Sequence, residues 1–331
     1  MQIYCTLFDR NYVTRGLALH SSLARHCADF RLLILCLDQA TLNALAQLSL
    51  PNAVLVPLDV LENHDPELRR VRPERSTVEY YFTCKPSLMQ FALEKYPTAD
   101  RICYLDSDLY YFANPEILEK DYSESAVALT PHRFPSHLGH FMHHGLFNAG
   151  WVSAKVDAEG ERFIAWWRAR CIEWCYVKIE PDRFGDQKYL DQVPGLFPNT
   201  AVLSHPGANA APWNLADLNV SPSSTTVCVN GKPLVFFHFH GLKRLLFNYY
   251  DSGLYQYEVE FSPSVRKLIY SPYLAEIGRL SATLQSLPAS IRMALRPHKA
   301  RLDVEAILRR IKRAGHVVVS GTGILASKES R

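Results

Sequence analysis

Apolar runs and helix-like segments alternate along the first third of the chain. The apolar runs are 3–9, 32–37, 53–58 and 101–109. The segments with helical spacing of apolar residues are 14–27, 39–48 and 87–96, the last of which follows Pro86. Unbroken apolar strands that alternate with helices are typical of a mainly parallel sheet with helices on both faces. We therefore expect an α/β fold whose ligands bind beyond the carboxyl ends of the strands.

The pattern changes in the second half of the chain. Two more strands and a tryptophan-rich helix are expected at 125–130, 147–155 and 159–175. The pair Asn230-Gly231 separates two apolar runs and predicts a two-residue hairpin turn. We expect residues 1–260 to form one compact α/β domain and residues 261–331 to form a helical region appended to it.

The C-terminal segment 290–331 is strongly basic. It holds ten Lys and Arg against three Asp and Glu, a net charge of +7, which leaves −4 for the rest of a chain whose total is +3. A protein that binds nucleic acid would more typically spread its basic residues over its body. We therefore expect no nucleic-acid partner, and the basic segment needs its own explanation.

A helix is expected in this segment from a cap at Asp303 to an end at Gly315, followed by a buried strand at 317–319. Its apolar face would consist of Val304, Ile307, Leu308 and Ile311. Because basic residues flank that face, the helix could lie in the interface of an anionic membrane. Alternatively, it packs on the domain with its basic face in solvent, and the sequence leaves both interpretations open.

The composition is that of a globular protein. Of 331 residues, 48% are hydrophobic and 21% are charged, which excludes a disordered or collagen-like chain. No run of about 18 apolar residues predicts a membrane span, and the first residues do not resemble a signal peptide. The eight cysteines are scattered without a CxxC pair, so we expect reduced thiols and a cytoplasmic protein.

Two carboxylates follow the apolar run that begins at Arg101. Asp106 and Asp108 are two positions apart, so strand geometry would direct both toward one ligand. Hard carboxylate oxygens suit Mg²⁺ or Mn²⁺ bridged to a phosphate. Pairs of aspartates on the surface after a strand are also common, and this motif alone does not decide between the two interpretations.

A second motif, near the end of the α/β region, favours the metal site. Alternation places His238 and His240 on one face of a strand, opposite Phe237 and Phe239. A histidine that joins two aspartates favours Mn²⁺ over Mg²⁺, because imidazole suits the softer ion. Lys243, just beyond, offers a positive charge to a phosphate.

Together these motifs resemble the GT-A fold nucleotide-sugar glycosyltransferases, and most closely glycosyltransferase family 8. The resemblance covers roughly residues 1–245. It rests on Thr6-Leu-Phe-Asp9-Arg-Asn-Tyr12, Asp106-Ser-Asp108, Phe147-Asn148-Ala149-Gly150, Gly185-Asp186-Gln187 and His238-x-x-Gly241. The last motif departs from the family pattern H-x-x-G-x-x-K-P-W, because Lys243 comes one residue early and Pro-Trp is absent.

The resemblance implies a UDP-sugar donor and a Mn²⁺ (or Mg²⁺) ion held by Asp106, Asp108 and His238. It also implies a division into a nucleotide-sugar and metal-binding part, 1–155, and an acceptor part, 156–260. The residues that would contact the donor are Asp9 and Tyr12 at the uridine, Lys85 and Lys243 at the phosphates or sugar, and Asn148 at the sugar. The residues that would act at the reacting centre are Asp186, through the sugar hydroxyls, and Gln187, beside the oxocarbenium-like carbon.

The family analogy implies transfer with retention of the anomeric configuration. Without that analogy, Asp186 could serve as the general base of an inverting displacement. A GT-A scaffold that binds a nucleotide sugar or glycan without turnover is a third possibility. The expected acceptor is a glycan or a lipid-linked saccharide in polysaccharide biosynthesis, with residues 290–331 available for an anionic membrane surface. The protein would then be cytoplasmic, either free or peripheral to the inner face of the membrane.

Other α/β enzyme classes lack their signatures here. No GxGxxG follows the first strand, no GxxxxGK[ST] occurs, and the loop after Phe8 holds no glycine. These absences argue against a dehydrogenase, a P-loop NTPase and a sugar nucleotidylyltransferase.

Three further clusters each allow two interpretations. Five histidines between 132 and 144 could form a mobile loop over the acceptor, or bind zinc through His140-x-x-His143. A group of arginines could contact an anionic acceptor or lie in solvent; its members are Arg69, Arg70, Arg72 and Arg75. A third group could contact the acceptor or lie in the core; its members are Asn209, Trp213 and Asn214.

Overall fold

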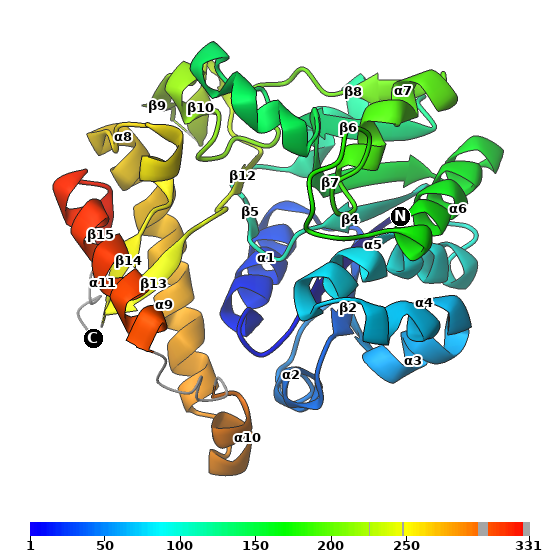
Figure 1. The fold of residues 1–331 in the computed structure, drawn as a ribbon, viewed down its shortest axis with the longest axis horizontal. Helices are drawn as coiled ribbons and strands as arrows, with labels where there is room; N and C mark the ends of the chain where they lie inside the picture. Colours follow the sequence, from blue (N-terminus) through cyan, green and yellow to red (C-terminus); the bar gives the residue numbers. More distant parts are fainter. Residues whose placement is uncertain (225, 247, 297–303, 327–331) are drawn as a thin grey trace.

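A seven-stranded sheet forms the centre of the computed structural model, which describes residues 1–224, 226–246, 248–296 and 304–326 (Figure 1). The strand order is β3-β2-β1-β4-β7-β6-β8. The bounds are β1 (Gln2–Phe8), β2 (Phe30–Cys36), β3 (Ala53–Pro57), β4 (Arg101–Leu105), β6 (Val127–Pro131), β7 (Phe147–Lys155) and β8 (Thr200–Val202). Strand β7 is antiparallel to both neighbours, and the other pairs are parallel. The predicted α/β fold with a mainly parallel sheet is confirmed.

Helices cover both faces of this sheet. Helix α1 (Val13–His26) packs on one face, and α5 (Thr77–Lys95) and α6 (Ala158–Glu173) pack on the other. Side chains of β1 alternate between the two layers, with Tyr4 and Phe8 on the α1 side and Ile3 and Cys5 on the α5 side. Because both faces are buried, the strands are apolar at nearly every position.

Shorter elements complete the fold. The remaining helices are α2 (Gln39–Leu45), α3 (Leu58–His64), α4 (Pro66–Val71), α7 (Val193–Leu196), α8 (Pro263–Val265), α9 (Ser271–Gln285), α10 (Ala289–Ala294) and α11 (Val304–Val319). The remaining strands are β5 (Leu109–Tyr111), β9 (Val220–Pro222), β10 (Val227–Val229), β11 (Lys232–Pro233), β12 (Phe236–His238), β13 (Lys243–Leu246), β14 (Tyr249–Asp251) and β15 (Gly323–Leu325). No helix in the described parts of the chain is long and apolar enough to cross a bilayer. All eight cysteines are free, as predicted.

Helix α5 begins ten residues before the predicted start at residue 87, so that prediction was wrong. Ser76 and Glu79 form a reciprocal capping box: the Ser76 amide donates to Glu79 Oε2 at 2.8 Å and the Glu79 amide donates to Ser76 Oγ at 3.4 Å. Pro86 lies inside the helix, where it removes one backbone donor. The cap and the buried face outweigh that loss, and Lys85 therefore lies in the middle of a helix.

The strand expected at 101–109 is divided. Strand β4 ends at Leu105, the chain turns through Asp106–Asp108 with the Leu109 amide donating to the Asp106 carbonyl at 3.1 Å, and β5 begins. Strand β5 pairs antiparallel with β12, with Leu109 opposite His238. This pairing brings the two sequence motifs, which are 130 residues apart, to one place.

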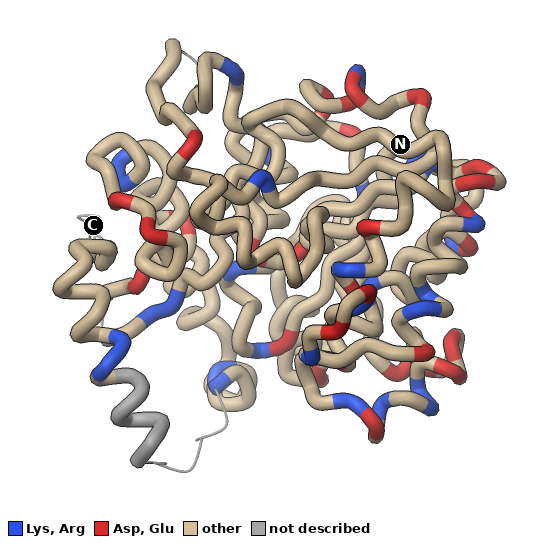
Figure 2. Tube along the Cα trace, turned by 45° about the horizontal axis from the view of Figure 1, so that its top comes forward, with Lys and Arg blue, Asp and Glu red and all other residues tan. Residues whose placement is uncertain are grey.

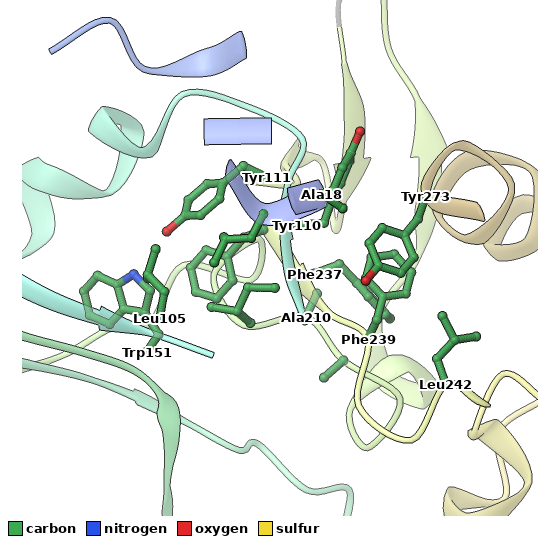
Figure 3. Close-up of a cluster of buried hydrophobic side chains, with 14 of the residues drawn as sticks. Ala18, Leu105, Tyr110, Tyr111, Trp151, Ala210, Phe237, Phe239, Leu242 and Tyr273 are labelled. Atoms are coloured by element: carbon green, nitrogen blue, oxygen red, sulfur yellow. The ribbon is translucent and has the colours of Figure 1, made fainter. Parts of the chain in front are cut away.

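A tightly packed cluster of rings lies behind that junction. Tyr110 and Tyr111 from β5, Phe237 from β12 and Tyr273 from α9 meet in it (Figure 3). Phe239 stacks on Tyr273 with ring centroids 3.7 Å apart. Phe237 and Phe239 are fully buried, as the alternation of this strand predicts.

The hairpin predicted at Asn230-Gly231 is confirmed. Val229 pairs with Lys232 across a two-residue turn, and both turn residues have positive φ, 48° for Asn230 and 75° for Gly231. This is the turn geometry that Asn-Gly favours.

The C-terminal region packs against the rest of the molecule. Helix α9 lies along α1, β15 pairs with β14, and Leu274 and Ile324 belong to the same hydrophobic core as α1 (Figure 1). The described residues of the C-terminal region, 261–296 and 304–326, are thus continuous with the main core through these contacts.

Helix α11 corrects two expectations. It continues through Gly315 to Val319, so neither the helix end at Gly315 nor the strand at 317–319 is present. Val317 is buried, whereas Val318 and Val319 are exposed, which is helical spacing. The predicted cap at Asp303 lies outside the described residues.

Candidate functional site

Three metal-ligand side chains converge at the carboxyl end of β4. Asp106 and Asp108 come from the β4–β5 turn, and His238 ends β12; one ligand atom of each lies within 4.8 Å of the others. His238 Nε2 is 3.1 Å from Asp108 Oδ1 and 3.9 Å from Asp106 Oδ2. Among the residues that the structure describes, this is the single cluster of its kind. Two carboxylates and an imidazole are a donor set that fits Mn²⁺, and Mg²⁺ less closely.

The electrostatics of the cluster favour an ionised carboxylate. Burial alone would raise the pKa of Asp108, but the neighbouring His238 and Arg15 hold the pKa well below its ordinary value. Tyr104, which lies on β4 two residues before Asp106, donates a hydrogen bond from its hydroxyl to Asp106 Oδ1 at 3.0 Å. Both aspartates can therefore present charged oxygens to a cation.

Asn148 orients the histidine of this cluster. Its Oδ1, which can only accept, lies 3.2 Å from His238 Nδ1, so Nδ1–H donates to the amide oxygen and Nε2 is the ring nitrogen directed toward the aspartates. The same Oδ1 accepts from the Gly150 amide at 3.1 Å. The sequence assigns Asn148 to the donor sugar, and the structure adds this contact with the imidazole, which the sequence did not reveal.

The lack of a side chain at Gly150 provides space for the residues of the cluster. A Cβ at this position would lie 2.7 Å from Asn148 Oδ1, 2.7 Å from His238 Cε1 and 2.9 Å from Asp106 Oδ2. These atoms belong to held side chains, so they cannot move without changing the ligand geometry.

We expect Gly150→Ala to weaken Mn²⁺ binding by roughly 10- to 100-fold, the range typical of changes around metal ligands. Isothermal titration calorimetry with Mn²⁺ measures this. The control is Gly278→Ala in α9, where an added Cβ meets no atom within 4 Å and alanine favours the helix. Equal Mn²⁺ affinities for the two variants would contradict the close packing at Gly150.

A cavity of about 450 Å³ adjoins the three side chains. This volume is in the range of small-molecule sites. It is lined by Leu7, Phe8, Asp9, Asn11, Tyr12, Leu37, Thr77, Val78, Tyr81, Phe82, Lys85, Tyr104, Asp106, Ser107, Asp108, His238 and His240. The structure therefore brings the predicted residues Asp9, Tyr12 and Lys85 to one cavity with the metal-ligand cluster. Tyr81 and Phe82, which the sequence did not single out, come from the early turns of α5.

Lys85 is buried between two carboxylates. Its Nζ lies 3.0 Å from Asp106 Oδ1 and 3.1 Å from Asp186 Oδ2 and donates to the Ala149 carbonyl at 3.4 Å. Burial opposes its charge, but Asp106 and Asp186 outweigh burial and raise the pKa of Lys85. Because α5 continues through this position, Lys85 lies inside the helix and is buried rather than solvated.

Asp186 and Gln187 lie behind the cavity and do not line it. Asp186 is 2% exposed, and burial raises its pKa although Lys85 acts in the opposite direction. Gln187 Oε1 accepts from Asn148 Nδ2 and from the Ala149 amide, both at 3.2 Å, and its Nε2 donates to the His144 carbonyl at 3.1 Å. Lys243 lies on β13, also outside the residues that line this cavity.

The histidine segment has a regular structure. Residues Ser136–His144 form 3₁₀ turns, and His132 is buried. Within the described parts of the chain, no third metal-ligand group joins His140 and His143. Whether this segment contacts an acceptor stays a prediction.

Several members of the other two clusters make contacts inside the protein, whereas Arg69 and Arg70 are exposed. Arg75 is buried and stacks on Tyr176 at 4.0 Å, and Arg72 pairs with Glu62 at 2.7 Å. Asn209, Trp213 and Asn214 are all buried. Trp213 packs edge-on against His238 with ring centroids 5.1 Å apart, so it supports the metal ligand from behind.

His132, which lies beside this site, makes the free energy of unfolding depend on pH under acidic conditions. Burial lowers its pKa from 6.5 to about 3, and its ring contacts the Leu146 carbonyl at 3.3 Å and Asn148 Nδ2 at 3.4 Å. Below pH 6.5 His132 is protonated in the unfolded chain, whereas in the folded chain it stays neutral down to about pH 3. The free energy of unfolding must therefore fall as pH falls through this window.

We expect His132→Gln to flatten this pH dependence by up to about 1.4 kcal/mol per pH unit between pH 6 and pH 4. Urea unfolding at several pH values measures the slope. The control is His137→Gln, because His137 is exposed and should leave the slope unchanged. The burial of an uncharged His132 is contradicted if both variants keep the wild-type slope.

Two sequence relatives cover most of the chain. The uncharacterized protein YfnD of Bacillus subtilis (strain 168) is 30% identical over 286 residues, which are 86% of this chain and 91% of YfnD. The uncharacterized protein YfnF of the same organism is 32% identical over 255 residues, 74% of this chain and 83% of YfnF. No model of a protein family matches the chain.

Solved structures share the fold. A galactosyltransferase LgtC in complex with donor and acceptor sugar analogs matches with a TM-score of 0.52 at 15% identity, over 89% of this chain and 100% of LgtC. An active-site mutant of LgtC matches with a TM-score of 0.55 at 17% identity, with the same coverage. At these identities the likeness shows a shared fold, and it confirms the GT-A architecture.

Proposed function

Because this chain belongs to one family with YfnD and YfnF of Bacillus subtilis and has the GT-A fold, we propose that it is a metal-dependent glycosyltransferase with a UDP-sugar donor. One observation carries the proposal: Asp106, Asp108 and His238 converge at the rim of a cavity of about 450 Å³. The cavity also holds Asp9 and Tyr12, the residues expected at the uridine.

In the proposed reaction, Asp106, Asp108 and His238 hold the cation. A Mn²⁺ or Mg²⁺ ion held by these residues would supply positive charge to the diphosphate leaving group. Asn148 fixes the tautomer and direction of His238 through the 3.2 Å contact with Nδ1. Lys85 adds a permanent positive charge beside Asp106 and is placed to attract the donor phosphate or sugar.

The position of Asp186 supports transfer with retention. A general base for an inverting displacement has to reach the acceptor hydroxyl directly or through one water. Asp186 is 2% exposed and its Oδ2 is 3.1 Å from Lys85, so we assign it to positioning Lys85 and, as the donor enters, the sugar. Gln187 holds the 148–149 backbone and is assigned to the same wall of the sugar site.

The proposal is tested by incubating the protein with a panel of UDP-sugars and Mn²⁺ and measuring UDP. We expect UDP release from at least one donor, and none when EDTA is present. If UDP-sugars bind but no UDP is released with any saccharide acceptor, the protein is the non-catalytic scaffold. No binding of UDP or any UDP-sugar with Mn²⁺ present, judged by thermal shift, would overturn the proposal.

We also propose that α11 faces an anionic membrane, where a lipid-linked saccharide acceptor would be found. Ile311, Val318 and Val319 are 62%, 67% and 89% exposed, and their spacing places them on one face of the helix. Lys312 adds a basic group beside that face. Apolar side chains with basic neighbours are typical of helices that lie in a membrane interface.

We expect co-sedimentation with phosphatidylglycerol vesicles at low salt, and a loss of most of the pelleted protein in the triple variant Ile311→Ser, Val318→Ser, Val319→Ser. Phosphatidylcholine vesicles are the control for charge. If the triple variant pellets as the wild type does, the exposed face of α11 is not the membrane contact.

A further inference from the structure

A second cavity, of about 480 Å³, lies on the other side of the Tyr12 loop from the metal-ligand cluster. Its lining comes from the loop after β1, α1, β13, β14, α9 and the end of α10. Helix α9 lies along α1, and α10 contacts α2 (Figure 1). Arg10 connects the loop after β1 to α10, because its Nη1 donates to the Ala294 carbonyl at 3.0 Å. The two cavities share Asn11 in their linings.

Arginines from four different parts of the chain line this second cavity. They are Arg10, Arg15, Arg244, Arg292 and Arg296. None of the described residues that line it carries a carboxylate. Basic residues are marked blue in Figure 2, which shows them along the C-terminal elements as well as on the main domain. Five like charges around one cavity repel each other, and a bound anion would relieve that repulsion.

The arginines differ in how far their charge is already compensated. Arg10 Nε is 2.9 Å from Asp38 Oδ2, and Arg15 lies over the ring of Tyr12 at 4.5 Å. Arg292 and Arg296 are exposed, and neither side chain pairs with any residue that the structure describes. These two guanidinium groups can therefore turn toward a ligand without breaking a contact to any residue within the described ranges.

The rest of the lining is apolar. Its apolar members are Val13, Leu242, Ile277, Leu284 and Leu295. A ligand that fills this cavity would meet guanidinium groups and aliphatic side chains together. Guanidinium groups bind phosphate through paired hydrogen bonds, and the aliphatic wall would bury a hydrocarbon chain.

We propose that this cavity binds a phosphate group carried on an apolar chain. The ligand could come from a membrane lipid or from a free phosphorylated compound with a hydrophobic part. The site is separate from the metal-ligand cluster, so the inference does not depend on the proposed transferase activity.

The test measures binding of two probes by isothermal titration calorimetry in EDTA, which keeps divalent cations from the Asp106 cluster. One probe is inorganic pyrophosphate, and the other is dihexanoyl phosphatidic acid below its micelle concentration. The double variant Arg292→Gln, Arg296→Gln removes the two uncompensated charges. The matched control, Arg31→Gln with Arg70→Gln, removes two exposed charges far from the cavity lining.

We expect the wild type to bind phosphatidic acid, and the cavity variant to bind it at least about tenfold more weakly, as the loss of charge-assisted hydrogen bonds predicts. The control variant should stay within about twofold of the wild type. Tighter binding of phosphatidic acid than of pyrophosphate supports a ligand with an apolar chain. Equal binding would show that the aliphatic wall contributes nothing, which contradicts the apolar part of the inference and leaves a site for the phosphate alone.

Two results would overturn the inference. One is no detectable binding of either probe to the wild type. The other is an equal loss of affinity in the two double variants, which would show that only overall charge matters. Failure of UDP release in the donor assay has no bearing on either result.

Discussion

We expect the replacement of Asp108 with asparagine to lower the proposed metal-dependent UDP release by roughly 10²- to 10³-fold or more, because an amide cannot supply the charged oxygen that the cation requires. Asp108 Oδ1 lies 3.1 Å from His238 Nε2, at the centre of the proposed ligand set. The measurement is the initial rate of UDP release from the best donor of the panel, over a range of Mn²⁺ concentrations. The rate should stay low even at saturating Mn²⁺.

The control for this substitution is Asp182→Asn, which changes an exposed aspartate in the loop after α6. It should leave the rate within about twofold of the wild type. UDP release that survives both Asp108→Asn and EDTA would contradict a metal-dependent mechanism at this cluster.

Replacing Lys85 with methionine is expected to cost about 3–5 kcal/mol of stability, because it leaves the buried carboxylate of Asp186 without its cation. Lys85 is 4% exposed and lies 3.0–3.1 Å from Asp106 and Asp186. Urea unfolding at pH 7 measures the loss. The companion variant Lys85→Met, Asp186→Asn should recover part of it, because the amide carries no buried charge.

An exposed lysine provides the comparison. Lys178 is 71% exposed and pairs with Glu180, so Lys178→Met should cost less than about 1 kcal/mol. A Lys85→Met variant as stable as Lys178→Met would show that the buried ion pairs do not form in the folded protein. Donor turnover should be lost in Lys85→Met at temperatures where the variant remains folded.

The sheet was predictable because its signal is local. Strands β1, β2 and β4 are buried on both faces over most of their length, so their sequences are nearly continuous apolar runs that need no knowledge of their neighbours. The division of 101–109 was not predictable in this way. The break at Asp106 comes from the pairing of β5 with β12, a partner more than 120 residues away.

The ends of two helices were mispredicted because different residues nearby favour different end points. Pro86 is a strong signal for a helix start, but the capping box of Ser76 and Glu79 sets the start of α5. The consequence is large for the site, since Lys85 becomes a buried residue inside a helix. For α11, Gly315 predicted an end, yet the helix continues and buries Val317.

The three residues of the candidate metal cluster could be singled out by residue type and order, whereas the residues that support them could not. Aspartates two apart and a histidine on a late strand carry recognisable chemistry. The contact of Asn148 with His238 joins side chains from two different strands. The contact of Tyr104 with Asp106 depends on how the chain turns after β4. No spacing in the sequence reports such contacts.

The central claim is that Asp106, Asp108 and His238 hold the cation that carries the donor diphosphate. Electron spin echo spectroscopy of Mn²⁺ bound to the protein with UDP tests it most directly, because a ligating imidazole modulates the Mn²⁺ signal through its nitrogen. We predict nitrogen modulation in the wild type and its loss in His238→Gln. Absence of nitrogen modulation in the wild type, or its persistence in His238→Gln, would contradict the claim.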